Sequence, residues 1–299
     1  MSEWLISLEG TEAGKTVALI LALQAAFLHA FFGALQKGKT DPFTARAMID
    51  ACYATMALPV ALFLVPWPAP ETWHLFAIAW VIHMGYKIAQ SSTYVVGAYT
   101  VVYPVVRGSS PAFTVIGAGI LFGEVFTSTQ WLGVLCLVVG IMGLAIYNLR
   151  HIVVDRARLP LALGLAFMTG GIVALYTTWD AFVIRAVADP LTFLAWFFLI
   201  DGIAFPIGCL IWAGGRLPRP FVPALKLGVL GAVVAIFSFG GILLATRLDK
   251  VGEAAVLRET SVVFAAFLGW VMLGEKVGPR RLALISLIAL GAVIVEWGG

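Results

Sequence analysis

The polar side chains best placed to bind a ligand lie inside the most apolar parts of this sequence. His83, Lys87, Gln90 and Tyr94 follow one another at spacings of four, three and four residues. That spacing puts them on one face of a helix, because a helix turns once in about 3.6 residues. Such a polar face could hold a polar or anionic solute. In the competing interpretation, Lys87 lies near a membrane surface and only extends its ammonium group to it.

Two arginines form a second set, since each lies well inside a predicted apolar span. A charge within a membrane helix costs roughly 2.5–3.5 kcal/mol unless a partner or water meets it. We therefore expect Arg107 and Arg258 to face the protein interior. Pro104 and Pro111 flank Arg107, and each proline removes one helical hydrogen bond. Backbone opened in this way is tolerated where it lines a cavity, so this stretch predicts a cavity wall with an arginine that meets an anionic group.

Acidic residues of the same interior are candidate salt-bridge partners, namely Asp50, Asp201 and Glu259. Three interpretations stay open for the two arginines: a structural or gating salt bridge, direct contact with a substrate, and extension to the membrane surface. An aspartate paired with arginine stays ionised at neutral pH, which favours facilitated transport or exchange over tight proton coupling. His29 is another histidine within a span, where a hydrogen bond between helices competes with ligand binding.

The composition requires a membrane environment for all these residues. The chain has 299 residues, of which 61% are hydrophobic and 12% charged, and its mean hydropathy is +0.99. Ten apolar runs are long enough to span a bilayer, and short turn-like connections separate them. They lie at about residues 14–36, 43–65, 72–92, 97–121, 128–148, 159–183, 190–212, 224–246, 251–273 and 277–297. We predict an all-α integral membrane protein with ten transmembrane helices.

An internal repeat relates the two halves of the chain. A shift of 151 residues aligns VVRGSSPAFTVIGAGILFGE (105–124) with VLRETSVVFAAFLGWVMLGE (256–275) without a gap, and it also places Asp50 on Asp201. Aligned charges in apolar spans are hard to attribute to chance. Each half then holds five spans, at residues 1–150 and 151–299, and an odd number inverts the second half relative to the first. Inverted repeats are typical of transporters, with the substrate site near the midplane between the halves.

The polar face described first belongs to one half alone. The same shift places Val234, Ser238, Gly241 and Ala245 opposite His83, Lys87, Gln90 and Tyr94. A symmetric scaffold does not need such a face. We therefore assign it to substrate selectivity.

The ends of the fourth and ninth spans, LFGE and MLGE, and the opening DPFTARAMID of the second span give the chain a family resemblance. It resembles the drug/metabolite transporter superfamily in its ten-helix EamA-type branch, over nearly the whole length. The resemblance implies two inverted five-helix bundles around a central cavity, which move small metabolites by alternating access and commonly export amino acids. At Gly123-Glu124 and Gly274-Glu275 we expect helix-ending turns, with each glutamate near the N-terminus of the next helix.

The function that follows is secondary transport, as an exporter or exchanger of small polar metabolites that are amino-acid-like or anionic. The alternatives are a flippase for lipid or lipid-linked headgroups on the same fold and an efflux carrier for cationic drugs. We expect a multi-pass protein of the plasma membrane, the inner membrane of a bacterium, with a small-molecule substrate. A monomer is expected, and a dimer stays open. The distribution of lysine and arginine favours both termini outside, whereas the resemblance implies both termini in the cytoplasm.

Other functional classes find little support in the sequence. Neither a GxSxG nor an HExxH motif is present, so we expect no enzyme and no catalytic residues. Cys52, Cys136 and Cys209 stand singly within spans, without the spacing of a metal site, and we expect neither a metal nor a cofactor. A net charge of +3 without a basic stripe argues against nucleic-acid binding.

Overall fold

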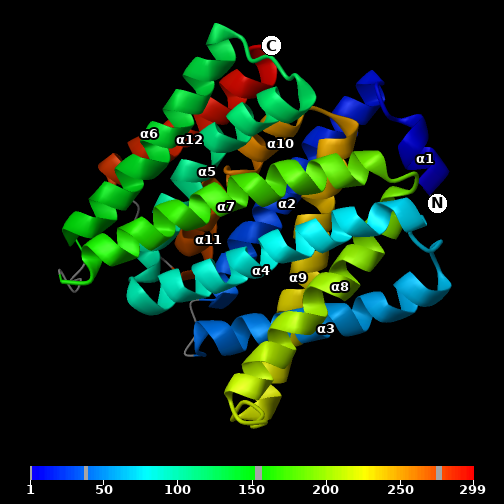
Figure 1. Ribbon diagram of the computed structural model, residues 1–299. Coiled ribbons are helices and arrows are strands. Elements are labelled where there is room, and N and C mark those ends of the chain that lie inside the picture. Colours follow the sequence, from blue (N-terminus) through cyan, green and yellow to red (C-terminus); the bar gives the residue numbers. More distant parts are fainter. Residues whose placement is uncertain (1, 37–39, 152–156, 274–277) are drawn as a thin grey trace.

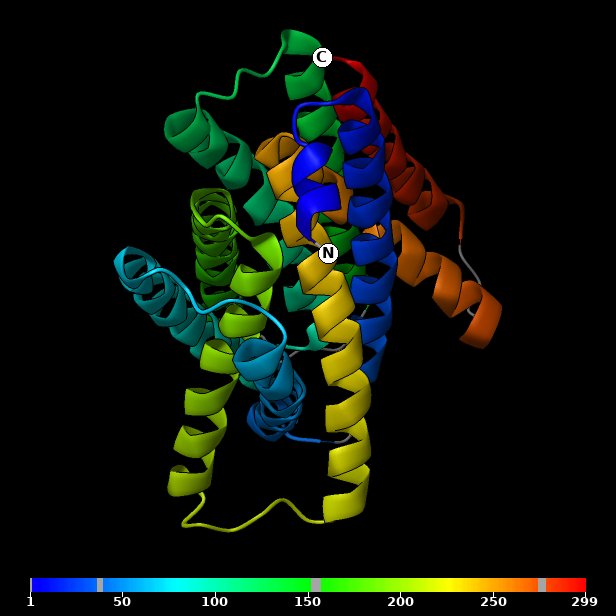
Figure 2. The same cartoon turned by 90° about the vertical axis from the view of Figure 1, so that its right-hand side faces the viewer.

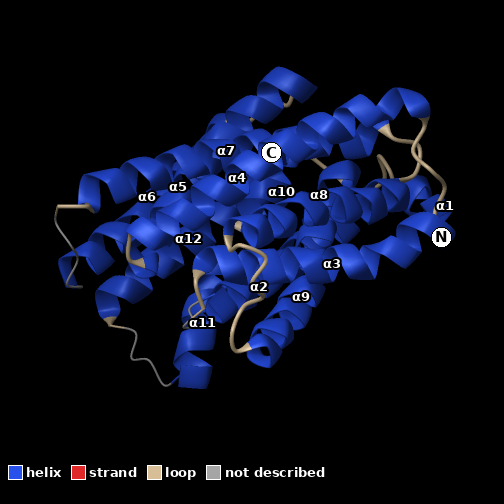
Figure 3. Cartoon of the chain, turned by 60° about the horizontal axis from the view of Figure 1, so that its bottom comes forward, coloured by secondary structure: helices blue, strands red, loops and turns tan. Residues whose placement is uncertain are grey.

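The computed structural model describes residues 2–36, 40–151, 157–273 and 278–299, and these ranges form helices without any strand. Figure 3 shows the helices joined by mostly short connections. In chain order (Figure 1) they are α1 (Ser2–Ser7), α2 (Glu12–Gln36), α3 (Pro42–Phe63), the 3-10 turn η1 (Pro70–Thr72), α4 (Trp73–Val96), α5 (Tyr99–Phe122), α6 (Ser128–His151), α7 (Leu159–Ala186), α8 (Pro190–Trp212), α9 (Phe221–Leu248), α10 (Val251–Arg258), α11 (Ser261–Leu273) and α12 (Pro279–Trp297).

Seven of the described helices are long and apolar enough to cross a membrane: α2, α3, α5, α6, α7, α8 and α9. The chain is thus a multi-pass membrane protein. α4 is as long as several of these, but its polar face lowers its hydropathy. α10 and α11 are each too short, and α12 carries charges at both ends. Membrane crossing by these remaining predicted spans stays a prediction.

One helix is interrupted in the second half of the chain, where its counterpart in the first half is continuous. α5 runs as one helix through Pro104 and Pro111, and each proline lacks the N–H that would complete a helical hydrogen bond. The corresponding segment of the second half breaks between α10 and α11, where no proline or glycine stands. There the N–H of Thr260 bonds to the carbonyl of Leu257 at 3.0 Å, and the Thr260 hydroxyl donates to the same carbonyl at 2.6 Å. A threonine side chain that bonds to nearby backbone in this way competes with the helical pattern.

Long helices pair closely around the centre of the protein. α2 packs against α9 (Figure 2), α3 against α8, α5 against α7, and α6 against α12. Gly133 of α6 and Gly291 of α12 permit a close approach in the last of these pairs. A Cβ atom at Gly291 would lie 2.6 Å from the carbonyl oxygen of Gly133 and 2.7 Å from the amide nitrogen of Leu137. Backbone atoms cannot move aside as a flexible side chain does.

We expect Gly291→Val to lower the Tm of the detergent-purified protein by about 5–10 °C, because overpacking a tight contact costs about 1–3 kcal/mol. Gly164→Val on α7 is the matched control, since a Cβ atom there meets nothing within 4 Å. Thermal unfolding followed by tryptophan fluorescence measures both variants. Equal Tm values for the two would show that α6 and α12 do not approach through these glycines.

Candidate functional site

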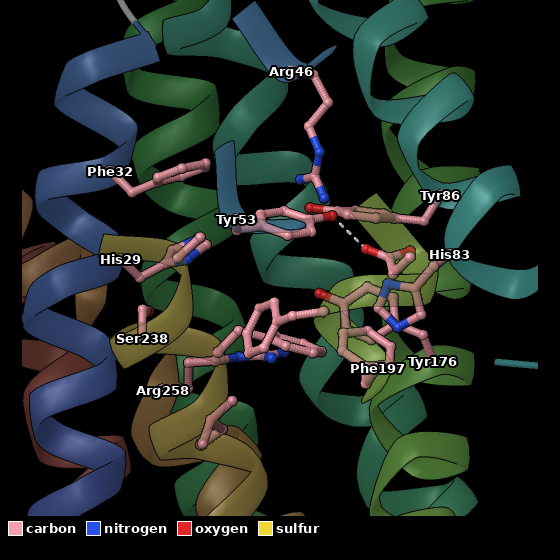
Figure 4. A pocket seen from close by; sticks show the side chains of 15 residues that line it. His29, Phe32, Arg46, Tyr53, His83, Tyr86, Tyr176, Phe197, Ser238 and Arg258 are labelled. Carbon is pink, nitrogen blue, oxygen red and sulfur yellow. Dashed lines mark hydrogen bonds between the residues drawn. The ribbon is translucent and has the colours of Figure 1, made fainter. Parts of the chain in front are cut away.

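A cavity of about 80 Å³ lies at the centre of the protein, among α2, α3, α4, α7, α8, α9 and α10 (Figure 4). It has room for several water molecules. Seven of its fifteen wall residues carry phenylalanine or tyrosine rings: Phe32, Tyr53, Tyr86, Tyr176, Phe197, Phe198 and Phe239. Its polar wall consists of His29, Arg46, His83, Asp201, Ser238 and Arg258. Charges of both signs therefore face one small, aromatic-walled space.

Lys87 lies in a buried ionic network beside this cavity and is not part of its wall. Its Nζ is 2.8 Å from Asp50 Oδ2 and 2.9 Å from Asp201 Oδ2. It also donates to the Asp201 carbonyl at 2.6 Å and to the Tyr53 hydroxyl at 3.1 Å. Tyr53 donates in turn to Asp201 Oδ2 at 2.5 Å, and Arg46 Nε is 2.7 Å from Asp50 Oδ1. Since Lys87 is 0% exposed, its ammonium group does not extend to a membrane surface.

His83 faces the cavity and is held there by Asp180, which is not among the site residues predicted from the sequence. Its Nε2 is 2.6 Å from Asp180 Oδ2, and both side chains are buried. The His83 ring packs between Tyr176 and Phe197, with ring centroids 4.7 and 4.8 Å away. The signal for Asp180 was present, because a carboxylate within the predicted span 159–183 requires a partner.

The two repeat-related arginines lie on either side of one carboxylate. Arg107 Nε is 2.8 Å from Glu259 Oε2, whereas Arg258 Nε is 3.9 Å from Glu259 Oε1. Arg258 also donates to the Thr177 hydroxyl at 3.3 Å. Arg258 lines the cavity, and Arg107 is not among the residues of its wall. The sequence pattern made the two arginines equivalent, but the structure gives them different surroundings.

The remaining predicted site residues are dispersed. Gln90 donates to the Tyr94 hydroxyl at 3.4 Å one turn further along α4, and neither belongs to the cavity wall. His29 lines the cavity from α2 and stacks on Phe32 and Tyr103, with centroids 6.3 and 6.4 Å away. The predicted polar face is thus divided among the wall, the buried ionic network and the far part of α4. A role in binding stays a prediction for all of these residues.

Eleven of the fifteen wall residues were not predicted from the sequence, and two of them, Arg46 and Tyr53, also belong to the buried ionic network. Each lies within one turn of Asp50 on α3, at spacings of four and three residues, where side chains share a helix face. That spacing was a usable signal for both. Their contact with the cavity depends on the neighbouring helices, which the spacing does not specify.

Glu124 caps a different helix from the one expected. Gly123 ends α5 in the left-handed conformation, with φ +67°, as the turn prediction requires. The Glu124 carboxylate, however, accepts from the N–H groups of Val251 at 2.7 Å and Gly252 at 3.0 Å, at the N-terminus of α10. The expectation that it serves the next helix, α6, is therefore wrong. Favourable interaction with the positive end of a helix dipole explains the contact. Gly274 and Glu275 lie outside the described residues.

Among the described residues, no group of three or more histidine, cysteine or carboxylate side chains is arranged to hold a metal ion.

Comparison with known proteins identifies the fold. The EamA-like transporter family matches residues 160–297, and no curated protein matches the chain. One similar solved structure, "Crystal structure of protein", has a TM-score of 0.73 and 16% sequence identity, and the match covers 93% of this chain and 96% of that one. At this identity the likeness shows a shared fold over nearly the whole length. Residues 160–297 thus match the EamA-like transporter family, which agrees with the drug/metabolite transporter superfamily that the sequence resembles.

Proposed function

We propose that the protein is a secondary carrier that moves a small zwitterionic, amino-acid-like metabolite through its central cavity by alternating access. The observation that carries this proposal is the pair of oppositely charged groups in the cavity wall. Arg258 Nε and Asp201 Oδ1 are both buried, and neither has a hydrogen-bond partner among the described residues. Buried polar groups are nearly always satisfied. A carboxylate at Arg258 and an ammonium group at Asp201 would satisfy both.

The rest of the wall suits a solute with an apolar part. Phe197 and Phe239 lie 5.3 Å apart between ring centroids, and Tyr176 lies 6.0 Å from Phe239. Ligand sites typically combine such an apolar wall with a few placed polar groups. A cavity of about 80 Å³ is small for an amino acid, so binding requires the surrounding helices to separate. The helix break between α10 and α11, directly beside Arg258, provides a point of movement.

Two inverted five-helix halves with ten spans are the architecture that we infer for this movement. The neighbour pairs of the helices support it. Under the 151-residue shift, the pair formed by α2 and α9 corresponds to the pair formed by α7 and α4. The pair formed by α5 and α7 corresponds to α10 and α11 packed against α2. All of these helices are in contact as the correspondence requires. The pairs α3–α8 and α6–α12 each join a helix to its own counterpart.

We expect counterflow in proteoliposomes to be accelerated by amino-acid-like zwitterions and not by the matched compounds that lack one charge. For each zwitterion, the decarboxylated amine and the deaminated acid serve as controls, because each leaves either Arg258 or Asp201 without its partner. A missing charge–charge contact weakens binding by about 1.5–3 kcal/mol, or roughly 10–100-fold. Exchange of the amines alone would support a cation carrier, and lipid scrambling without exchange would support a flippase. Either result contradicts the proposal.

A further inference from the structure

The ammonium group of Lys87 stands where a bound cation would stand. Four oxygen atoms surround its Nζ at 2.6–3.1 Å: one carboxylate oxygen each from Asp50 and Asp201, the Asp201 carbonyl oxygen and the Tyr53 hydroxyl. They come from two helices, α3 and α8, and Lys87 enters between them from α4. An ammonium group has three protons, so these oxygens account for all of its hydrogen-bonding capacity.

The charges of this network balance only because the lysine is present. Arg46 and Lys87 carry two positive charges, and Asp50 and Asp201 carry two negative ones. Without the ammonium group, two carboxylates would share the buried space with Arg46 alone. One cation would then be missing, and the remaining oxygens would already be arranged around its place.

The internal repeat also indicates that Lys87 fills the place of a cation. Asp50 and Asp201 occupy equivalent positions of the two halves, but the counterpart of Lys87 is Ser238. Ser238 donates to the carbonyl of Ala25 at 2.9 Å and lines the cavity. The first half therefore supplies, in Lys87, the cation that contacts the aspartates of both halves.

The site borders the central cavity through its own ligands. Tyr53 and Asp201 belong to both the cavity wall and the oxygen set around Lys87. Asp201 is 3% exposed, and its second carboxylate oxygen, Oδ1, has no hydrogen-bond partner among the described residues. A free cation in the cavity would therefore meet this site once the lysine is shortened.

We propose that Asp50, Asp201 and Tyr53 form a binding site for a monovalent cation in which the Lys87 ammonium group is the permanent occupant. Because it is covalently attached, this cation cannot be released to either side of the membrane. Transport then needs no co-transported Na⁺ or proton at this site. This consequence for transport rests on the proposed function, whereas the cation site itself does not.

The test is the thermal stability of Lys87→Ala in four chloride salts of equal concentration: N-methylglucamine, methylammonium, Na⁺ and K⁺. In N-methylglucamine we expect a Tm lower than that of the unsubstituted protein by on the order of 10 °C, since the variant leaves buried charge uncompensated. Methylammonium replaces the removed end of the side chain and should restore about half of this loss in a saturable manner. Lys226→Ala is the matched control, because Lys226 is exposed on α9. Its Tm should be the same in all four salts.

A double variant, Lys87→Ala with Asp50→Asn, separates charge balance from general damage. It removes one positive and one negative charge, so it should be more stable than Lys87→Ala in N-methylglucamine and should not respond to methylammonium. The proposal is overturned if Lys87→Ala has the same Tm in all four salts. It is also overturned if Lys87→Ala cannot be purified in any of them, whether or not the double variant can.

Counterflow with the unsubstituted protein distinguishes this proposal from the proposed function. Equal exchange rates with Na⁺, K⁺ or N-methylglucamine on both sides, and with or without a pH gradient, are expected. If the unsubstituted protein exchanges zwitterions but the Tm of Lys87→Ala is the same in all four salts, the carrier function holds and the cation site is disproved. If the Tm of Lys87→Ala depends on the cation but no zwitterion is exchanged, the cation site holds and the proposed function is disproved.

Discussion

Glu259→Gln is expected to lower the free energy of unfolding by about 3–5 kcal/mol, because it removes the carboxylate that Arg107 and Arg258 share. Glu259 is 0% exposed, and its oxygens lie 2.8 Å from Arg107 and 3.9 Å from Arg258. A glutamine keeps the shape but not the charge, so two guanidinium groups would be left in a buried site without compensation. Thermal unfolding in detergent should show a Tm lower by on the order of 10 °C.

Glu253→Gln, on α10, which ends directly before Glu259, is the matched control. Glu253 accepts from Gln130 at 2.7 Å and pairs at 2.7 Å with Lys250, whose side chain is 41% exposed. Glutamine can still accept from Gln130, and the lost ion pair is partly in solvent, so we expect a cost of about 1 kcal/mol or less. If both variants were equally stable, the buried arginines would not depend on Glu259 for their compensation.

The positions of the helices followed closely from the sequence, because they depend on local properties. The run predicted at 190–212 is helix α8, Pro190–Trp212, and the run at 128–148 is α6, Ser128–His151. The length of the apolar run determines the length of such a helix, and proline and serine are common residues at a helix N-terminus. The break after Arg258 was missed for an equally local reason. It coincides with hydrogen bonds from Thr260 to the Leu257 carbonyl, whereas Pro104 and Pro111 lie within an unbroken α5.

The composition of the site was only partly predictable, because its contacts join residues far apart in the sequence. The 151-residue repeat singled out Asp50 and Asp201 as buried charges, and the helical spacing singled out Lys87. Neither pattern indicated that this lysine lies between the two aspartates. That arrangement depends on how α3, α4 and α8 are rotated about their axes when they pack. Likewise, the repeat made Arg107 and Arg258 equivalent. The two arginines differ because only Arg258 is followed in the chain by a glutamate, Glu259, and this glutamate pairs more closely with Arg107.

Arg258→Gln should yield a folded protein that binds its zwitterionic substrate about 10–100-fold more weakly. Arg258 lines the cavity, and its polar contacts among the described residues are the 3.9 Å approach to Glu259 and the 3.3 Å hydrogen bond to Thr177. Glu259 keeps its closer partner, Arg107, so the loss of Arg258 leaves no unpaired buried carboxylate. What is lost is a charge-assisted and potentially bidentate contact with the substrate carboxylate, worth about 1.5–3 kcal/mol. Isothermal titration with a zwitterion that gives counterflow measures the change in Kd.

Arg107→Gln is the contrasting variant at the equivalent position of the first half. Arg107 is buried, pairs with Glu259 at 2.8 Å and is absent from the cavity wall. Its loss leaves Glu259 with the distant Arg258 alone, so the expected effect is a lower Tm with a Kd for the folded fraction within about twofold of the original. Two outcomes would contradict the assignment of Arg258 to the substrate: weakened binding in Arg107→Gln at unchanged stability, or unchanged binding in Arg258→Gln. The substrate carboxylate would then lie at the arginine of the other half, behind the present cavity wall, and the helix break beside Arg258 would need a role other than movement at the binding site.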